Sequence, residues 1–308
     1  MNVRVVANKF SSLNENAKQM LIDAGFDYKE YDYSVWLNEE TLKEFIKDAD
    51  AIVAGVEVYT PEILRSAPNL KILARRGVGI DNFPQDYCKE NNIIITRTVG
   101  AVENAVAEMI IAFCLEFSRQ INVMDKDLKN GKWKRILTSE LSGKNLCILG
   151  YGAIGERLAI MAKVFNMNIY YNKRNRLDKE KEEKLGITYL PFDELVKTAD
   201  FLSVNTPLTN ETRSIINLDV INKMKKSAYI INTARGPVCN TKDLIYALEN
   251  ELIAGYATDV FDNEPCDPEF KKFTNVILTP HVGTFTYQSM IAMNERCSKE
   301  IIKCLKGE

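Results

Sequence analysis

The sequence has 308 residues, of which 46% are hydrophobic and 27% are charged, and its formal net charge is -2. This length is sufficient for two domains that each bury a hydrophobic core. A net charge so close to zero creates no global field that would recruit nucleic acid or an anionic membrane, so we expect neither as a partner.

The first hundred residues alternate between short apolar runs and longer helical patterns. The predicted strands are residues 3–7, 51–54, 71–74 and 93–96, and residues 12–24 and 42–48 have helical periodicity. This alternation is typical of βα units that form a parallel sheet.

Residues 101–120 are predicted to form one long helix. Between Ala105 and Leu115 its apolar side chains cover nearly every face. A helix that is apolar all round is expected to be buried on all sides, either in a core or between domains or subunits.

A second series of βα units follows residue 144. Its predicted strands are residues 145–149, 167–171, 201–204, 228–232, 255–258 and 276–278, and a last helix covers residues 287–305. We therefore predict an α/β protein with two Rossmann-like, doubly wound parallel-sheet domains and a cleft between them. One domain comprises residues 1–98 plus 286–308, and the other comprises residues 99–285.

The strand at residues 145–149 runs directly into the glycine-rich segment GYGAIG, which precedes a helical stretch. In this context Gly150 permits a tight turn, Gly152 lets the backbone approach a pyrophosphate, and Gly155 lets helix and strand pack closely. The N–H groups of Ala153 and Ile154 would face the phosphates at the positive end of the helix. The segment predicts that residues 99–285 bind a dinucleotide; a glycine-rich turn without a ligand is the alternative.

Three further strand ends carry groups suited to catalysis. Arg235 follows residues 228–232, Glu264 lies in an acidic stretch after residues 255–258, and His281, the only histidine, follows residues 276–278. Each alone is compatible with an ordinary surface residue. Because ligands of parallel sheets bind at the carboxyl ends of strands, the three together with the glycine-rich segment predict an active site.

The motifs GYGAIG, NTARG, DVFDNEP and TPHVG occur in the order and at the spacings of the D-isomer-specific 2-hydroxyacid dehydrogenases, and the chain resembles this family over nearly its whole length. The resemblance implies hydride transfer between a nicotinamide and C2 of a small 2-oxo or 2-hydroxy acid. His281 would be the general acid and base, Glu264 would support its imidazole, and Arg235 would bind the substrate carboxylate. Phosphoglycerate dehydrogenase and glyoxylate or hydroxypyruvate reductase are the candidate activities.

An alternative interpretation is a non-catalytic dinucleotide-responsive binding protein, like the corepressors that resemble this family. The sequence also departs from the family pattern at two places. Residues 98–102 lack the usual proline and asparagine, and Asn205 stands where the family often has histidine.

The resemblance also assigns binding residues. Beyond the glycine-rich segment, the cofactor would contact Thr206, Pro207, Thr233, Ala234, Arg235, Asp259, His281 and Gly283. The backbone N–H groups of Val78 and Gly79 would cradle the substrate carboxylate. Arg75 would bind a second anionic group on the substrate; alternatively it is solvated or paired with a carboxylate such as Glu57.

The end of the second strand of this domain favours NADP(H) over NAD(H). An acidic residue about 20 positions beyond the glycines would accept the ribose 2′-OH of NAD(H). Asn172 occupies this place, and Lys173 and Arg174 follow it. Their side chains could bind a 2′-phosphate by charge-assisted hydrogen bonds. Loose binding of NAD(H) beside a basic surface loop is the alternative.

The remaining expectations concern location and assembly. The seven cysteines form no CxxC pair and the N-terminus has no signal-peptide pattern, so we predict a cytoplasmic protein with reduced thiols and assign no metal ligand. The apolar helix and Trp133 in a polar arm predict a homodimer, since one subunit offers limited surface to bury that helix and the resemblance implies dimerisation through this region.

Overall fold

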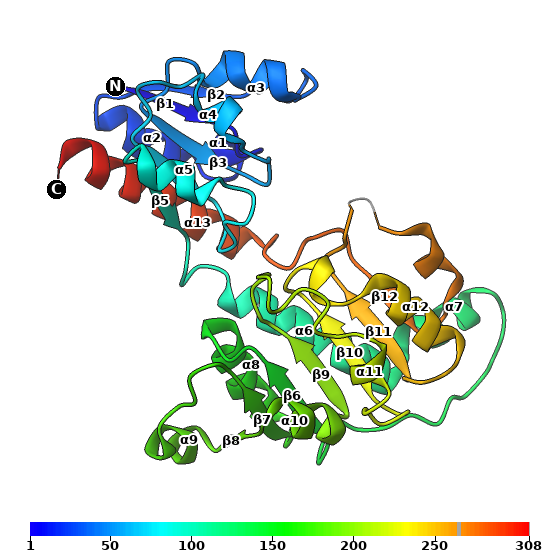
Figure 1. The fold of residues 1–308 in the computed structure, drawn as a ribbon. Coiled ribbons are helices and arrows are strands. Elements are labelled where there is room, and N and C mark those ends of the chain that lie inside the picture. The colour runs from blue at the N-terminus through cyan, green and yellow to red at the C-terminus, as the bar shows by residue number, and fades with distance from the viewer. Residues whose placement is uncertain (264–265, 308) are drawn as a thin grey trace. The chain divides into compact units, whose positions relative to one another are not determined.

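The computed structural model of the protein describes residues 1–263 and 266–307. The chain forms two compact units (Figure 1): unit 1 comprises Met1–Val102 and Thr284–Glu308, and unit 2 comprises Glu103–Gly283. The chain passes from one unit to the other at residues 102–103 and 283–284, whereas the sequence suggested residues 98–99 and 285–286.

Unit 1 is built on a parallel five-stranded sheet in the order β2-β1-β3-β4-β5. Its strands are β1 (Asn2–Val5), β2 (Asp27–Glu30), β3 (Ala51–Ala54), β4 (Ile72–Arg75) and β5 (Ile94–Arg97). Four of them coincide with predicted strands to within two residues. The sequence did not predict β2, because its residues DYKE are mostly polar and its position at the edge of the sheet leaves them partly exposed.

The helices of unit 1 are α1 (Phe10–Leu13), α2 (Glu15–Asp23), α3 (Glu39–Ile46), α4 (Pro61–Leu64), α5 (Gln85–Glu90) and α13 (Tyr287–Lys306). The single helix predicted for residues 12–24 is wrong. Asn14 interrupts it with an extended φ of -154°, and its side chain caps α2 by accepting a hydrogen bond from Ala17 N. The C-terminal α13 packs against α2 and β4.

Side chains alternate across this sheet and fill two separate cores. Ala51 and Val53 pack in one apolar cluster with residues of α2 and α13. Ile52 and Ala54, which point to the opposite face, pack with residues of α3 and α4. Because strands buried on both faces carry continuous apolar runs, these segments could be recognised in the sequence.

Unit 2 is built on a parallel seven-stranded sheet in the order β12-β11-β10-β9-β6-β7-β8. Its strands are β6 (Asn145–Leu149), β7 (Asn168–Asn172), β8 (Thr188–Tyr189), β9 (Phe201–Val204), β10 (Tyr229–Asn232), β11 (Gly255–Thr258) and β12 (Val276–Leu278). Only the two-residue β8 was not predicted. The two parallel sheets confirm the predicted fold class of two doubly wound α/β domains.

Helices cover both faces of this sheet. They are α6 (Glu103–Arg119), α7 (Ile121–Lys129), α8 (Ala153–Val164), α9 (Lys179–Leu185), α10 (Phe192–Thr198), α11 (Leu218–Ile221) and α12 (Thr241–Glu249), with short 3-10 turns η1 (Gly236–Val238) and η2 (Pro268–Lys272). Leu146 and Ile148 of β6 pack with α6 and α8, whereas Cys147 and Leu149 pack on the face that α10 and α12 cover.

The long helix α6 is mostly buried in unit 2, against α8. Asn104, Glu108 and Ala112 form an exposed stripe on α6 at intervals of four residues, so the core of unit 2 does not bury the helix on all sides; burial of this stripe between domains or subunits stays a prediction. No helix in residues 1–263 and 266–307 has the combination of length and apolar character needed to span a membrane.

Candidate active site

The order of the strands in unit 2 indicates which edge of the sheet would bind a ligand. From β6 the chain proceeds to β7 and β8 on one side, and then to β9 and the strands beyond it on the other. All paired strands are parallel, so the segments that follow them meet at one edge of the sheet. A crevice outside the carboxyl ends, at the point where the strand order reverses, is where such sheets bind ligands.

The glycine-rich segment begins at this point of reversal, directly after β6. Gly150 has a φ of +94°, and a Cβ atom on it would lie 2.6 Å from the backbone nitrogen of Thr206. A Cβ on Gly155 would lie 3.1 Å from the carbonyl oxygen of Gly150. Gly150 therefore requires glycine for the close approach of two backbones, and Gly155 allows a tight contact between the helix and the end of the strand.

The remaining glycine of the motif, Gly152, lies beside open space. A Cβ on Gly152 would meet no heavy atom within 4 Å. Gly152 is the N-cap of α8, and no side chain caps the N–H groups that open this helix at Ala153 and Ile154. The open space and the uncapped N–H groups fit the pyrophosphate of a dinucleotide.

The strand beside it, β7, ends at Asn172, as the sequence predicted. The Asn172 side chain donates a 2.8 Å hydrogen bond from Nδ2 to the carbonyl oxygen of Leu190. Lys173 is half-buried and Arg174 is exposed. Arg176, the third cation of this stretch, is ion-paired with Glu182 at 2.7 Å. This pair was not predicted, because neither residue belongs to a recognised motif.

The segments after β9 and β10 contribute polar atoms at the same edge. Asn205 follows β9 by one residue and precedes Thr206 and Pro207, and Thr233 follows β10 directly. The Oδ1 atom of Asn205 and the Oγ1 atom of Thr233 are buried and have no hydrogen-bond partner within the described parts of the chain. Buried polar atoms without partners are costly, so both fit contacts with a bound polar ligand.

Buried Asn232, the last residue of β10, fixes the turn that carries Arg235. Its Oδ1 accepts a 3.0 Å hydrogen bond from Ala234 N, and its Nδ2 donates a 2.9 Å hydrogen bond to the carbonyl oxygen of Arg235. A Cβ on Gly236 would collide with the backbone of Phe261, so this turn lies directly against the segment that follows β11. The backbone at half-buried Arg235 is therefore held in place by the Asn232 side chain and by the neighbouring segment.

Asp259 follows β11 and is 2% exposed. Its Oδ1 accepts hydrogen bonds from Thr279 Oγ1 at 2.6 Å and Val282 N at 2.8 Å, and its Oδ2 accepts one from Gly283 N at 2.7 Å. The carboxylate thus binds the loop on both sides of His281. The sequence singled out Asp259 as a cofactor residue but did not predict this role.

His281 is exposed and has a φ of +53°, a left-handed conformation that is uncommon for residues other than glycine. Its backbone nitrogen donates a 3.0 Å hydrogen bond to the carbonyl oxygen of Thr279. Strands β10, β11 and β12 are adjacent, so Arg235, Asp259 and His281 follow three neighbouring strand ends. The third predicted catalytic residue, Glu264, lies outside the described residues.

The predicted substrate residues Arg75, Val78 and Gly79 belong to unit 1. Arg75 ends β4 and is 8% exposed, and its guanidinium donates from Nε to the carbonyl oxygen of Gly79 at 3.0 Å and from Nη1 to the carbonyl oxygens of Gly55 and Arg76. The alternative that Arg75 is solvated is therefore wrong. Backbone carbonyls satisfy much of its hydrogen-bonding capacity.

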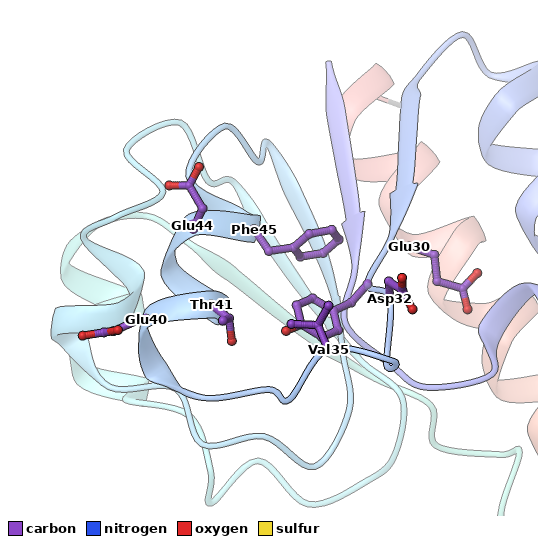
Figure 2. Close-up of a pocket in the computed structure, with 8 residues that line it drawn as sticks. Glu30, Asp32, Val35, Glu40, Thr41, Glu44 and Phe45 are labelled. Carbon is purple, nitrogen blue, oxygen red and sulfur yellow. The ribbon is translucent and has the colours of Figure 1, made fainter.

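Unit 1 also has an open pocket of about 550 Å³ beside β2 and α3 (Figure 2). Val35 and Phe45 contribute apolar surface to it. In Figure 2 the carboxylates of Glu30, Glu40 and Glu44 point away from the Phe45 ring. Glu30 accepts hydrogen bonds from Phe10 N and Tyr28 Oη, so it has a structural role. None of the residues predicted for the active site lines this pocket.

Comparisons with known proteins agree with this geometry. The family model for the NAD-binding domain of D-isomer specific 2-hydroxyacid dehydrogenases matches residues 111–283. A glyoxylate reductase from Pyrococcus furiosus is 38% identical over 296 residues, which cover 91% of this chain and 88% of that protein. The crystal structure of a glyoxylate reductase from Paecilomyes thermophila superposes with a TM-score of 0.90 at 30% identity, covering 100% of this chain and 96% of that one.

A D-lactate dehydrogenase from Aquifex aeolicus, crystallised with NAD and lactic acid, has a TM-score of 0.87 at 27% identity and covers 100% of this chain and 96% of its own. The resemblance noted from the sequence motifs is thus confirmed over the whole chain. The relatives are named as reductases and dehydrogenases, which favours an enzyme over a non-catalytic binding protein. The chain therefore belongs to the D-isomer specific 2-hydroxyacid dehydrogenase family and is an oxidoreductase with an NAD-binding domain.

Proposed function

We propose that the protein reduces a small 2-oxo acid, with glyoxylate and hydroxypyruvate as the first candidates, and uses NADP(H) in preference to NAD(H). The observation that carries the proposal is the adjacency of β10, β11 and β12, which brings Arg235, Asp259 and His281 to the edge of the sheet where the glycine-rich segment lies. Glyoxylate reductases among the relatives support the substrate class.

When bound, a nicotinamide cofactor would supply the hydride needed to reduce the substrate carbonyl. The imidazolium of His281 donates a proton to the carbonyl oxygen as the C–O bond becomes single, and in the reverse direction the neutral imidazole removes the proton from the hydroxyl. Glu264 favours the protonated imidazole through its negative charge. Arg235 binds the substrate carboxylate and polarises the carbonyl. Asp259 holds the loop of His281 in place and remains a candidate contact of the nicotinamide carboxamide.

The preference for NADP(H) rests on the residues after β7. Asn172 is neutral where an acidic side chain would repel a 2′-phosphate, and its Nδ2 is already bound to Leu190. Lys173 and exposed Arg174 follow it and can donate charge-assisted hydrogen bonds to a phosphate. The same proposal includes further cofactor contacts, which are Thr206, Pro207, Thr233, Ala234, His281 and Gly283.

The preference for glyoxylate or hydroxypyruvate over a phosphorylated substrate rests on Arg75. Three of the five N–H groups of its guanidinium donate to the carbonyl oxygens of Gly55, Arg76 and Gly79, and its side chain is buried, so we assign it mainly to holding this backbone rather than to a second anionic group on the substrate. The backbone N–H groups of Val78 and Gly79 remain candidates for binding the substrate carboxylate.

The proposed assembly is a homodimer formed through α7 and the segment that follows it. Every residue of α7 lies outside the core, and Ile121, Leu128, Trp133 and Leu137 expose large apolar side chains. Large apolar side chains exposed close together in the sequence are typical of a surface that a partner subunit covers. The expectation of a dimer therefore rests on these exposed side chains and not on α6, which is mostly buried within unit 2.

The test is a steady-state assay of NADPH and NADH oxidation with glyoxylate, hydroxypyruvate, pyruvate and 3-phosphohydroxypyruvate. We expect the highest catalytic efficiency with NADPH and one of the first two acids. If none of the four acids is reduced with either cofactor, the proposal is wrong. If 3-phosphohydroxypyruvate is the best substrate, the argument from Arg75 is wrong, although the reaction class stands.

A further inference from the structure

Glu182 is a buried carboxylate of unit 2 that the proposed reaction does not use. It lies in α9, and its Oε1 accepts hydrogen bonds from the hydroxyl of Tyr171 at 2.6 Å and from Arg176 Nε at 2.8 Å. Its Oε2 accepts a 2.7 Å hydrogen bond from Arg176 Nη2, which completes a two-pronged pair. Hydrogen bonds from Arg176 and Tyr171 lower the pKa of Glu182 to about 2, so the carboxylate is charged at neutral pH.

Tyr171 and Glu182 together anchor the far end of the loop that follows β7. The hydroxyl of Tyr171 also accepts a 3.0 Å hydrogen bond from Leu177 N. The guanidinium of Arg176 lies 5.0 Å from the centre of the Tyr189 ring, on the neighbouring strand β8. Residues 176 and 177 are therefore tied to the sheet through a buried acid, a tyrosine hydroxyl and an aromatic ring.

The near end of the loop is anchored at Asn172. Its carbonyl oxygen accepts a 3.0 Å hydrogen bond from Gly150 N, and its Nδ2 donates to the carbonyl oxygen of Leu190 at 2.8 Å. Between the two anchors lie only residues 173–175. Because a residue spans at most about 3.5 Å of chain, this short span has little freedom to move away from the end of β7.

We propose that Glu182, together with Arg176, is a positioning pair that determines selectivity for a 2′-phosphate by holding Lys173 and Arg174 at the end of β7. This inference rests on the NADP(H) preference proposed above. A competing assignment would make Arg176 itself the phosphate ligand. The structure favours a positioning role, because Nε and Nη2 of Arg176 both bind Glu182.

The decisive variants change the hydrogen bonds made to Glu182 with little change in side-chain volume. Glu182→Gln keeps the shape but directs an amide N–H₂ group toward the guanidinium, so the two-pronged pair is lost. Tyr171→Phe removes only the hydroxyl that joins Glu182 to Leu177, and it guards against misfolding of the first variant. Glu183→Gln is the matched control, because it is the same chemical change at an exposed position of the same helix.

Binding is measured by calorimetric titration with adenosine 2′,5′-bisphosphate and with adenosine 5′-monophosphate. We expect the wild type to bind the bisphosphate more tightly. Glu182→Gln and Tyr171→Phe should weaken bisphosphate binding about tenfold, as expected when one charge-assisted contact is displaced, and leave monophosphate binding unchanged. In steady-state assays the KM for NADPH should rise by the same factor, whereas kcat and the KM for NADH should remain unchanged. Glu183→Gln should match the wild type.

The outcomes separate this inference from the cofactor proposal. If the wild type does not prefer the bisphosphate, the NADP(H) proposal is wrong and the positioning role falls with it. If the wild type prefers it and both variants retain that preference, only the positioning role is wrong. A gain of bisphosphate affinity in Glu182→Gln would identify a released Arg176 as the phosphate ligand and would also overturn the positioning role.

Discussion

The carboxylate of Asp259 accepts a 2.7 Å hydrogen bond from the backbone N–H of Gly283, two residues beyond His281. It accepts another at 2.8 Å from Val282 N and a third at 2.6 Å from Thr279 Oγ1. A buried acid at the end of β11 therefore fixes the loop after β12. Because His281 adopts a left-handed backbone, these contacts hold the proposed proton donor in a conformation that it would rarely adopt alone.

Asp259→Asn should therefore lower both stability and turnover. An asparagine keeps one acceptor oxygen but turns an N–H₂ group toward a backbone donor, so at least one hydrogen bond to a charged group is lost, worth about 1.5–3 kcal/mol. We expect a lower melting temperature and a lower kcat. Asp262→Asn is the matched control, because Asp262 is exposed and its carboxylate accepts a hydrogen bond from Thr241 Oγ1 rather than from the loop of His281. Equal kcat and melting temperature in Asp259→Asn and the wild type would contradict the positioning role of Asp259.

Gly150→Ala should abolish dinucleotide binding and destabilise unit 2. Its positive φ costs an alanine about 1–2 kcal/mol, and its Cβ would also collide with the backbone of Thr206. Gly143→Ala has the cost of a positive φ without the collision, because Gly143 has a φ of +74° and no heavy atom within 4 Å of a built Cβ, so the difference between the two variants measures the collision. Thermal unfolding and NADPH titration should show a larger loss for Gly150→Ala. Similar losses in the two variants would mean that the close approach to Thr206 does not matter.

Much of the fold could be predicted because its strands are apolar and buried on both faces. Strands β3, β6, β9, β11 and β12 have the predicted bounds. Polar β2 and the two-residue β8 have no such signal, and the break at Asn14 depends on a cap rather than on periodicity. The extent to which unit 2 buries α6 could not be predicted, since small residues such as Ala112 look apolar in a sequence but can be exposed.

The proposed site was predictable only where a motif carries it. The glycines that allow two backbones to approach occur at fixed positions relative to the strand before them. The same holds for single polar residues that follow buried strands. The contacts of Asp259 with residues 279–283, and of Glu182 with Arg176 and Tyr171, depend on which strands are neighbours. Sheet order is a tertiary property, so spacing along the chain does not reveal these partners.

Trp133→Ser should convert the proposed homodimer to a monomer. Trp133 is 82% exposed after α7, in the apolar surface proposed as the subunit interface. Trp36→Ser is the matched control, since Trp36 is 83% exposed in unit 1, outside this surface. Light scattering at micromolar concentration should give a dimer for the wild type and for Trp36→Ser. A monomeric wild type would refute the dimer, and an unchanged Trp133→Ser dimer would exclude this interface.

Replacing His281 should lower kcat by roughly 10²–10⁴ because it removes proton transfer to the substrate oxygen. His281→Ala would also strain the left-handed backbone. His281→Asn separates the two effects, because asparagine tolerates this conformation but cannot transfer the proton. Both variants should weaken NADPH binding far less than they lower kcat. Near-normal turnover of either variant on every acid that the wild type reduces would remove His281 from the catalytic set.

Arg174→Ala should raise the KM for NADPH about tenfold and leave the KM for NADH unchanged, because a charge-assisted contact with the 2′-phosphate is lost and the rest of the dinucleotide site is intact. Arg65→Ala, the same change at an exposed position of unit 1, is the control. The ratio of catalytic efficiencies with NADPH and NADH measures the effect. A wild-type preference for NADH that Arg174→Ala does not alter would mean that Asn172 accepts the ribose 2′-OH and that the basic residues after it are a solvated surface.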